Sequence, residues 1–166
     1  MANSRKSPET WIAAGLKTLP KTGPDGLRAE TLARQINTTK GSFYWHFKDV
    51  PSFQNELLQT WADQAKTLYD GTMEREATSV TKLRALAQVR PKPVDVAVRG
   101  WATFDPTARK AVNRVDRHII SQLTALLNDL EATHPDFPGL VHTAMVAAPK
   151  SGTHAETLVD LLLVLK

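Results

Sequence analysis

Apolar residues recur every three or four positions along most of the chain, which is the spacing of one face of an α-helix. The longest such run extends from Ala108 to Leu130 and follows Asp105 and Pro106, which are suited to open a helix. This run predicts a single helix of about 25 residues, about 37 Å long. The chain is therefore expected to be all-α.

Shorter periodic runs predict the other helices, and Pro, Gly and capping residues separate them. Ser7 and Pro8 open the first helix, Pro20 is expected to end it, and His134 to Gly139 is expected to form a loop. The remaining helices are expected at residues 28–36, 40–47, 51–71, 80–89, 94–104, 140–148 and 154–165.

Residues 28–48 predict two short helices joined by a tight turn. In the first, Ala29, Leu32 and Ala33 share a face that can be buried. Asn37 is suited to end that helix, because its short side chain tolerates the left-handed backbone conformation. Thr39 is suited to cap the second helix, since its hydroxyl can accept a hydrogen bond from a free backbone N–H.

The second of these helices has the features of a DNA-reading element. Phe43 and Phe47 lie four residues apart and can anchor it from one side. A major groove admits an α-helix, hydrogen bonds and apolar contacts read base edges, and Gly41 permits close approach of the backbone. The alternative is a solvated helix surface whose aromatic residues serve only the core. The expected DNA-contacting residues are Arg28, Thr31, Thr39, Lys40, Gly41, Ser42, Tyr44, Trp45, His46 and Lys48.

The run TTKGSFYWHFKD, with LARQIN upstream, resembles the helix-turn-helix signature of the TetR/AcrR family of bacterial transcriptional regulators over about residues 7–62. The resemblance implies a three-helix DNA-binding domain at residues 1–50 and a helical effector-binding and dimerisation domain at residues 51–166. It also implies a homodimer that binds a palindromic operator on double-stranded DNA as a ligand-responsive repressor. One departure is Val50 followed by Pro51, where the family commonly has a basic residue that contacts phosphate.

The placement of charge agrees with a polyanion held at one end of the chain. The formal net charge is +4, and residues 1–50 hold eight Lys or Arg against four acids. The remaining residues are therefore electrically balanced. A basic head on a neutral body suits DNA binding, although a charge of this size is also ordinary for solubility.

Two further sets of residues are candidates for binding a small-molecule effector and for pairing two copies of the chain. Large side chains in the body can line an apolar cavity, or they can simply fill the core. Small and branched residues near the C-terminus can form a four-helix dimer interface, or they can pack on their own chain. The effector candidates are Trp61, Met73, Trp101, Phe104, His118 and Gln122, and the interface candidates are Ala144, Ala148, Leu158, Leu161, Leu162 and Leu165.

Other function classes have little support in the sequence. There is no cysteine, the five histidines are not paired at helical spacing, and no catalytic motif is present, so we expect no metal, no cofactor and no enzyme activity. No apolar run approaches the length of a membrane span, and a cytoplasmic protein is expected. Two alternatives stay open: a small-molecule-binding helical protein with weak or lost DNA binding, and a helical enzyme or interaction module.

Overall fold

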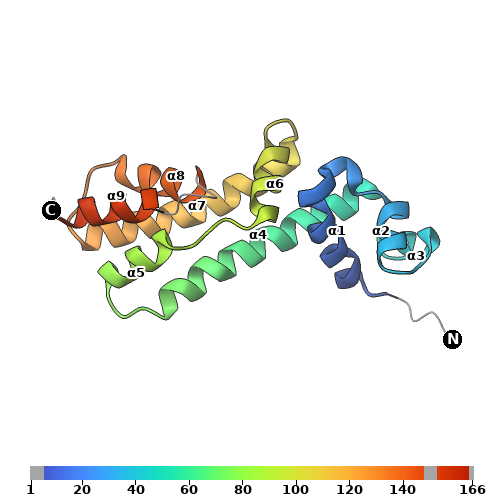
Figure 1. Ribbon diagram of the computed structural model, residues 1–166, viewed down its shortest axis with the longest axis horizontal. Helices are drawn as coiled ribbons and strands as arrows, with labels where there is room; N and C mark the ends of the chain where they lie inside the picture. The colour runs from blue at the N-terminus through green and yellow to red at the C-terminus, as the bar shows by residue number, and fades with distance from the viewer. Residues whose placement is uncertain (1–5, 148–152, 165–166) are drawn as a thin grey trace. The chain divides into compact units, whose positions relative to one another are not determined.

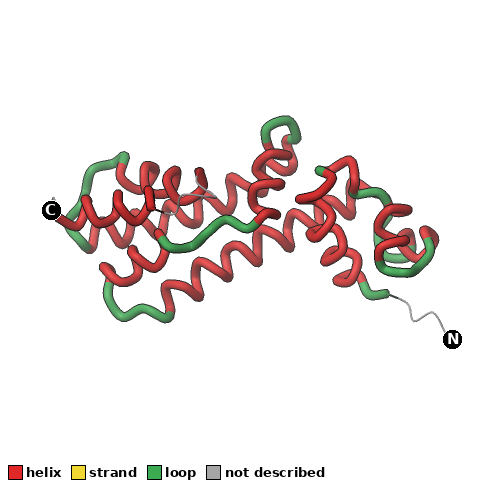
Figure 2. Tube along the Cα trace, in the orientation of Figure 1, coloured by secondary structure: helices red, strands yellow, loops and turns green. Residues whose placement is uncertain are grey.

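The computed structural model describes residues 6–147 and 153–164, and within these ranges it contains helices and no strand (Figures 1 and 2). This confirms the all-α prediction. The α-helices are α1 (Pro8–Thr22), α2 (Ala29–Gln35), α3 (Lys40–Tyr44), α4 (Val50–Glu74), α5 (Ser79–Ala87), α6 (Pro93–Ala102), α7 (Pro106–Asp129), α8 (Phe137–Ala147) and α9 (Thr153–Val164), and one 3-10 turn, η1 (Pro24–Gly26), precedes α2.

The described residues group into two compact units. The first contains the residues up to Ala62 together with Pro93–Val112, and the second contains Asp63–Lys92 and the residues from Asn113 onward. The long helices α4 and α7 each contribute residues to both units. A functional division at residue 50 is a separate question that this grouping does not decide, so that division remains a prediction.

Aromatic side chains from α1, α3 and α4 form the centre of the first unit. The ring centroid of Phe43 lies 5.3 Å from that of Trp11 and 5.3 Å from that of Phe53, and the rings of Phe47 and Phe53 are 5.0 Å apart. Each of these four side chains is at most 2% exposed. Burial of each ring contributes about 1.5–3 kcal/mol, so this aromatic cluster fixes three helices to one another.

Helix α1 packs closely on α4 at a glycine. A Cβ atom built on Gly15 would lie 2.5 Å from Leu57 Cδ1 and 2.8 Å from Phe53 Cζ. Both of those side chains are fully buried and have little room to move aside. The absence of a side chain at Gly15 therefore allows the two helices to pack at this distance.

Several helix boundaries differ from those expected from the sequence. The prediction that Pro20 ends the first helix is wrong: α1 continues to Thr22 and ends at Gly23, whose φ is 67° and whose N–H donates to Leu19 O at 2.9 Å. Proline in the last turn removes a single hydrogen bond, which the helix tolerates here, whereas the left-handed glycine ends it.

Helices α4 and α8 also begin earlier than expected. Asp49 accepts a hydrogen bond from the Ser52 N–H at 2.7 Å and thereby caps α4, which starts at Val50 and runs on to Glu74. Helix α8 starts at Phe137, inside the expected loop, with Pro138 in its first turn. A proline costs little there because the first N–H groups of a helix have no partner within the helix.

The second unit has an aliphatic core to which α5, α7, α8 and α9 contribute. Helix α9 packs against both α5 and α8. Two partly exposed ion pairs, Arg84 with Asp160 and Arg90 with Glu156, join the α5 region to α9 and contribute modestly because water screens them. The fully buried aliphatic residues here include Leu83, Leu86, Ile119, Leu123 and Val141.

Gly15→Ala is expected to destabilise the protein by about 1–3 kcal/mol, because the added methyl group overlaps buried side chains of α4. Gly100→Ala is the matched control: Gly100 also lies within a helix, but a methyl group there meets nothing within 4 Å. That substitution should leave stability unchanged or raise it by about 0.5–1 kcal/mol. Urea unfolding followed by circular dichroism measures both, and equal unfolding free energies would contradict the packing argument.

Candidate nucleic-acid interface

Helices α2 and α3 are joined by a turn whose backbone follows the sequence prediction. Helix α2 ends at Gln35, and Asn37 then adopts a left-handed conformation with φ 51°. The Thr38 N–H donates to Ala33 O at 2.9 Å, which satisfies a carbonyl at the end of α2. The Thr39 hydroxyl accepts from the Ser42 N–H at 3.3 Å. The predicted roles of Asn37 and Thr39 are therefore confirmed.

Helix α3 is held in place by side chains rather than by its own length. It has five residues, and a single turn is not stable as an isolated helix. Phe43 is fully buried and Phe47 is 2% exposed, with their ring centroids 5.1 Å apart. These two rings fix which face of α3 points into the protein, as the four-residue spacing predicted.

Helix α3 ends at Tyr44, short of the expected residue 47, and exposed aromatic and polar groups lie on it and on the turn that follows it. Tyr44 is 49% exposed and Trp45 is 73% exposed. Ser42 and His46 are half-buried, and the His46 Nε2 atom is buried without a hydrogen-bond partner among the described residues. The other expected contact residues are exposed at the surface: Arg28, Thr31, Thr39, Lys40, Gly41 and Lys48.

Gly41 is not required by packing inside the protein. A Cβ atom built there would lie 3.8 Å from Thr39 Oγ1, an ordinary contact distance, and the φ of Gly41 is not positive. The fold would accept alanine at this position. A bare backbone at the exposed start of α3 is therefore available for close approach by an external partner.

Lys40 is paired across the turn with an acid that the sequence analysis did not single out. Its Nζ atom lies 2.7 Å from Glu30 Oε1, with both side chains more than half exposed. The hydrogen bond from Lys40, followed by the lysine's charge, lowers the pKa of the Glu30 carboxyl, and the same contact raises the pKa of Lys40. In the sequence, this pair is indicated only by the presence of an acid, Glu30, on the outward face of α2. A separation of ten residues matches no contact pattern within a helix.

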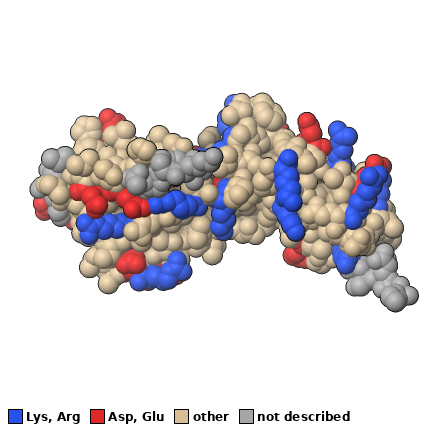
Figure 3. Space-filling model, in the orientation of Figure 1, with Lys and Arg blue, Asp and Glu red and all other residues tan. Residues whose placement is uncertain are grey.

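The basic residues of the first unit are dispersed. On the face shown in Figure 3, Lys and Arg side chains over the N-terminal helices alternate with other residues and with some Asp and Glu, and they do not merge into one patch. On this face the cations are therefore separate from one another.

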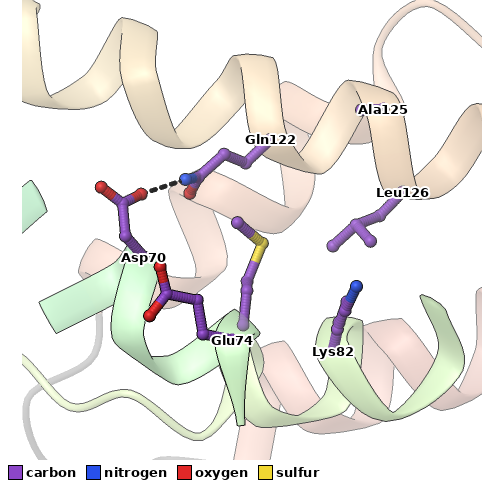
Figure 4. A pocket seen from close by; sticks show the side chains of 7 residues that line it. Asp70, Glu74, Lys82, Gln122, Ala125 and Leu126 are labelled. Atoms are coloured by element: carbon purple, nitrogen blue, oxygen red, sulfur yellow. Dashed lines mark hydrogen bonds between the residues drawn. The ribbon is translucent and has the colours of Figure 1, made fainter. Parts of the chain in front are cut away.

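The candidate effector residues fall into two groups. Met73 and Gln122 line a cavity of about 400 Å³ in the second unit (Figure 4). His118 contacts Asp70, another residue of its wall. The other three belong to the first unit: Trp61 is 3% exposed and donates to Asp95 at 2.8 Å, Trp101 is buried, and Phe104 is 68% exposed. The structure does not bring these three to the cavity. The sequence analysis missed the remaining lining residues, Asp70, Glu74, Lys82, Ala125 and Leu126.

The candidate interface residues are also divided by the structure. Leu161 is 54% exposed, Ala144 and Leu158 are half-buried, and Leu162 is 6% exposed because it packs within its own chain. Ala148 and Leu165 lie outside the described residues. Leu140 on α8 and Val164 on α9 are exposed apolar residues that the sequence analysis did not include. Dimerisation through α8 and α9 stays a prediction.

Two other features were sought in the part of the chain that the structure describes. It holds no group of three or more His, Asp or Glu side chains placed to bind a metal ion. None of its helices combines the length and the apolar character that crossing a membrane requires.

No protein-family model and no curated protein sequence matches the chain. Solved structures match it over nearly its whole length. A transcriptional regulator from Rhodococcus sp. Rha1 has a TM-score of 0.75 at 19% identity, covering 96% of this chain and 95% of that one. A TetR-family transcriptional regulator from Vibrio parahaemolyticus has a TM-score of 0.69 at 17% identity, with coverage of 95% and 96%. A transcriptional regulator from Saccharomonospora viridis, solved in complex with choline, has a TM-score of 0.60 at 17% identity, with coverage of 93% and 92%.

The chain has the TetR-like fold. This confirms, at the level of the fold, the resemblance carried by residues 32–49, and it extends the likeness to the body, where the sequence showed only helical periodicity. Identities below one in five establish the TetR-like fold alone, since one fold can support different functions. The function has to be argued from the residues of α2, α3 and the cavity.

Proposed function

We propose that this chain is a DNA-binding transcriptional regulator that acts as a homodimer on a palindromic operator, with α3 placed in the major groove. The observation that carries the proposal is the construction of α3. Two buried phenyl rings fix its inner face, while Lys40 at its start, Tyr44 at its end and Trp45 just after it are exposed. Exposing the apolar surface of two large aromatic side chains to water is unfavourable. Contact with base edges and sugars in a DNA groove would remove that surface from water.

The surrounding residues supply the groups that DNA binding uses. Lys40, Lys48 and Arg28 are exposed cations on or beside the turn, and cations of this kind position a protein on phosphates. Tyr44 and Ser42 provide hydroxyl groups, and Trp45 an indole N–H, for hydrogen bonds to bases or phosphates. In a homodimer, two copies of α3 would enter successive major grooves about 34–36 Å apart.

The cavity in the second unit is the proposed effector site. Asp70, Met73 and Glu74 lie on α4, whose N-terminal part contributes Phe53 to the aromatic cluster behind α3. A ligand in the cavity would bias the position of α4 and thereby the DNA-binding heads, relieving repression. A structural neighbour described in complex with choline supports a small-molecule effector for this architecture.

The competing proposal is a small-molecule-binding protein with weak or lost DNA binding. Two observations favour it: Lys40 is already paired with Glu30, and Val50 and Pro51 stand where a phosphate-binding basic residue is common. Selection of duplexes from a random pool by the full chain distinguishes the two. Enrichment of an inverted repeat supports the regulator, and recovery of unenriched DNA at low salt supports the competing proposal.

Lys40→Ala is expected to weaken binding of the selected duplex and to reduce the slope of log affinity against log salt by about 0.9, the contribution of one phosphate contact. Lys110→Ala, at an exposed lysine on α7, is the control and should change neither quantity. Tyr44→Phe should weaken binding with no change in slope, because only a hydroxyl group is lost. Fluorescence anisotropy over a salt series measures all three, with circular dichroism to verify folding. Unchanged affinity and slope for Lys40→Ala would exclude the phosphate contact.

Glu30→Gln is expected to strengthen DNA binding by about two- to fivefold, because it releases Lys40 from an exposed ion pair of modest strength. It also removes a negative charge from the side of the turn that faces the phosphates. Glu131→Gln is the matched control at an exposed acid in the second unit. The same anisotropy assay applies, and a loss of affinity in Glu30→Gln would show that the pair positions Lys40 for DNA rather than competing with it.

A further inference from the structure

The cavity in the second unit has walls of two kinds. Its apolar side is made by Met73, Ala125 and Leu126, and its polar side by the carboxylates of Asp70 and Glu74 together with the amide of Gln122 (Figure 4). Lys82, on α5, is the cation among the lining residues. A volume of about 400 Å³ is within the range of small-ligand sites.

Asp70 is held in a fixed orientation by two side chains of α7. The His118 Nε2 atom lies 2.7 Å from Asp70 Oδ1, and the Gln122 amide nitrogen donates to the same oxygen. The other carboxylate oxygen, Oδ2, has no hydrogen-bond donor among the described residues. The carboxylate is therefore oriented by the protein, yet one of its oxygens remains free to accept from a ligand.

Asp70 is ionised at neutral pH. Burial raises the pKa of its carboxyl, but the hydrogen bonds from His118 and Gln122, with the charges of His118 and Lys66, outweigh that effect and lower the pKa below its ordinary value. Because the pKa is lowered, the Asp70 carboxyl group is charged at any pH above the ordinary pKa of an aspartate. It takes up a proton only when the pH falls into the more acidic region. The polar wall therefore carries the negative charge of Asp70 at the pH of a cell, with the Glu74 side chain beside it on the same wall.

The Gln122 amide leaves one acceptor unsatisfied. Its nitrogen must face Asp70, because the opposite orientation would set two oxygen acceptors against each other. The Oε1 atom is then buried, and it has no hydrogen-bond partner among the described residues. Because Oε1 is covered by protein atoms, the acceptor that this wall leaves open to a ligand is Asp70 Oδ2.

We propose that the cavity binds a protonated primary or secondary amine that carries an apolar tail. The N–H groups of the ammonium donate to the open oxygen of the Asp70 carboxylate, the Glu74 side chain adds a second carboxylate to the same wall, and the tail packs on Met73, Ala125 and Leu126. The inference rests on the proposed function only in taking this cavity as the effector site. It goes further in naming the chemistry of the ligand.

The same arrangement disfavours three other ligand classes. An anion meets two carboxylates. A quaternary ammonium satisfies the charge but has no N–H to donate to Asp70 Oδ2. A neutral alcohol donates one hydrogen bond and leaves the carboxylates without a counter-charge. Lys82 opposes a second positive charge at the far end of the ligand, so a monocation fits better than a diamine.

Isothermal titration calorimetry of the full chain, without DNA, tests the ligand class with four probes that share one tail: octan-1-amine, octyltrimethylammonium, octan-1-ol and octanoate. Octan-1-amine is expected to bind at least about tenfold more tightly than each of the others, since hydrogen bonds to charged groups are worth about that factor or more. Equal or tighter binding of any of the other three, or no binding of octan-1-amine, would overturn the proposal.

Glu74→Gln is expected to weaken octan-1-amine binding by about five- to tenfold while leaving octan-1-ol unaffected, because it removes one of the two charges and keeps the shape. Glu56→Gln is the matched control: it is the same change on the same helix, at an exposed residue outside the cavity. Lys82→Met should strengthen amine binding by removing the like charge. Equal losses in Glu74→Gln and Glu56→Gln would overturn the proposal.

DNA binding is measured separately by anisotropy with the selected duplex, so the two proposals can fail independently. If the chain binds octan-1-amine but selects no DNA sequence, the proposed regulator function is wrong and the proposed amine site is supported. Sequence-specific DNA binding by a chain that binds no octan-1-amine would do the reverse.

Discussion

Burial of the aromatic cluster is the constraint on which the proposed DNA-binding side of this protein depends. Helix α3 is one turn long and cannot hold its own orientation by backbone hydrogen bonds. Phe43 and Phe47 supply that orientation by packing against Trp11 of α1 and Phe53 of α4. Because these rings come from three helices, the direction in which Tyr44 and Trp45 point is set by the whole first unit. A substitution in the cluster would therefore move the outward residues without touching them.

Local signals in the sequence were enough to predict this region. The left-handed Asn37, the cap at Thr39 and the inward pair of phenylalanines depend on neighbours within four residues, and the structure has all of them. Helix ends that depend on tertiary packing were predicted less well. Pro20 can read as a stop because it lacks an N–H, but packing and Gly23 decide where α1 ends.

Residues far apart in sequence escaped prediction because periodicity carries no information about them. Helical spacing shows which residues face inward, but it does not show which inward residues leave a gap. The size of Trp61 and Trp101 suits either a cavity wall or the core, and both side chains are buried. The cavity forms where smaller or flexible side chains such as Met73 and Ala125 meet. Its polar wall joins Asp70 to His118 across 48 residues, a pairing that no local pattern indicates.

The carboxylate contacts of Glu30 and Asp70 differ in a way that suits the two proposed tasks. Glu30 holds Lys40 at the surface, where water screens the pair and little free energy is needed to separate it. In the proposed DNA complex, a phosphate would replace Glu30 in an exchange that responds to salt. Asp70 is partly enclosed and is held by two donors from one helix, so its geometry is fixed before a ligand arrives. A carboxylate fixed in this way distinguishes ligands by the direction of their hydrogen bonds as well as by their charge. The number of N–H groups on an amine should therefore matter for binding, in addition to its positive charge.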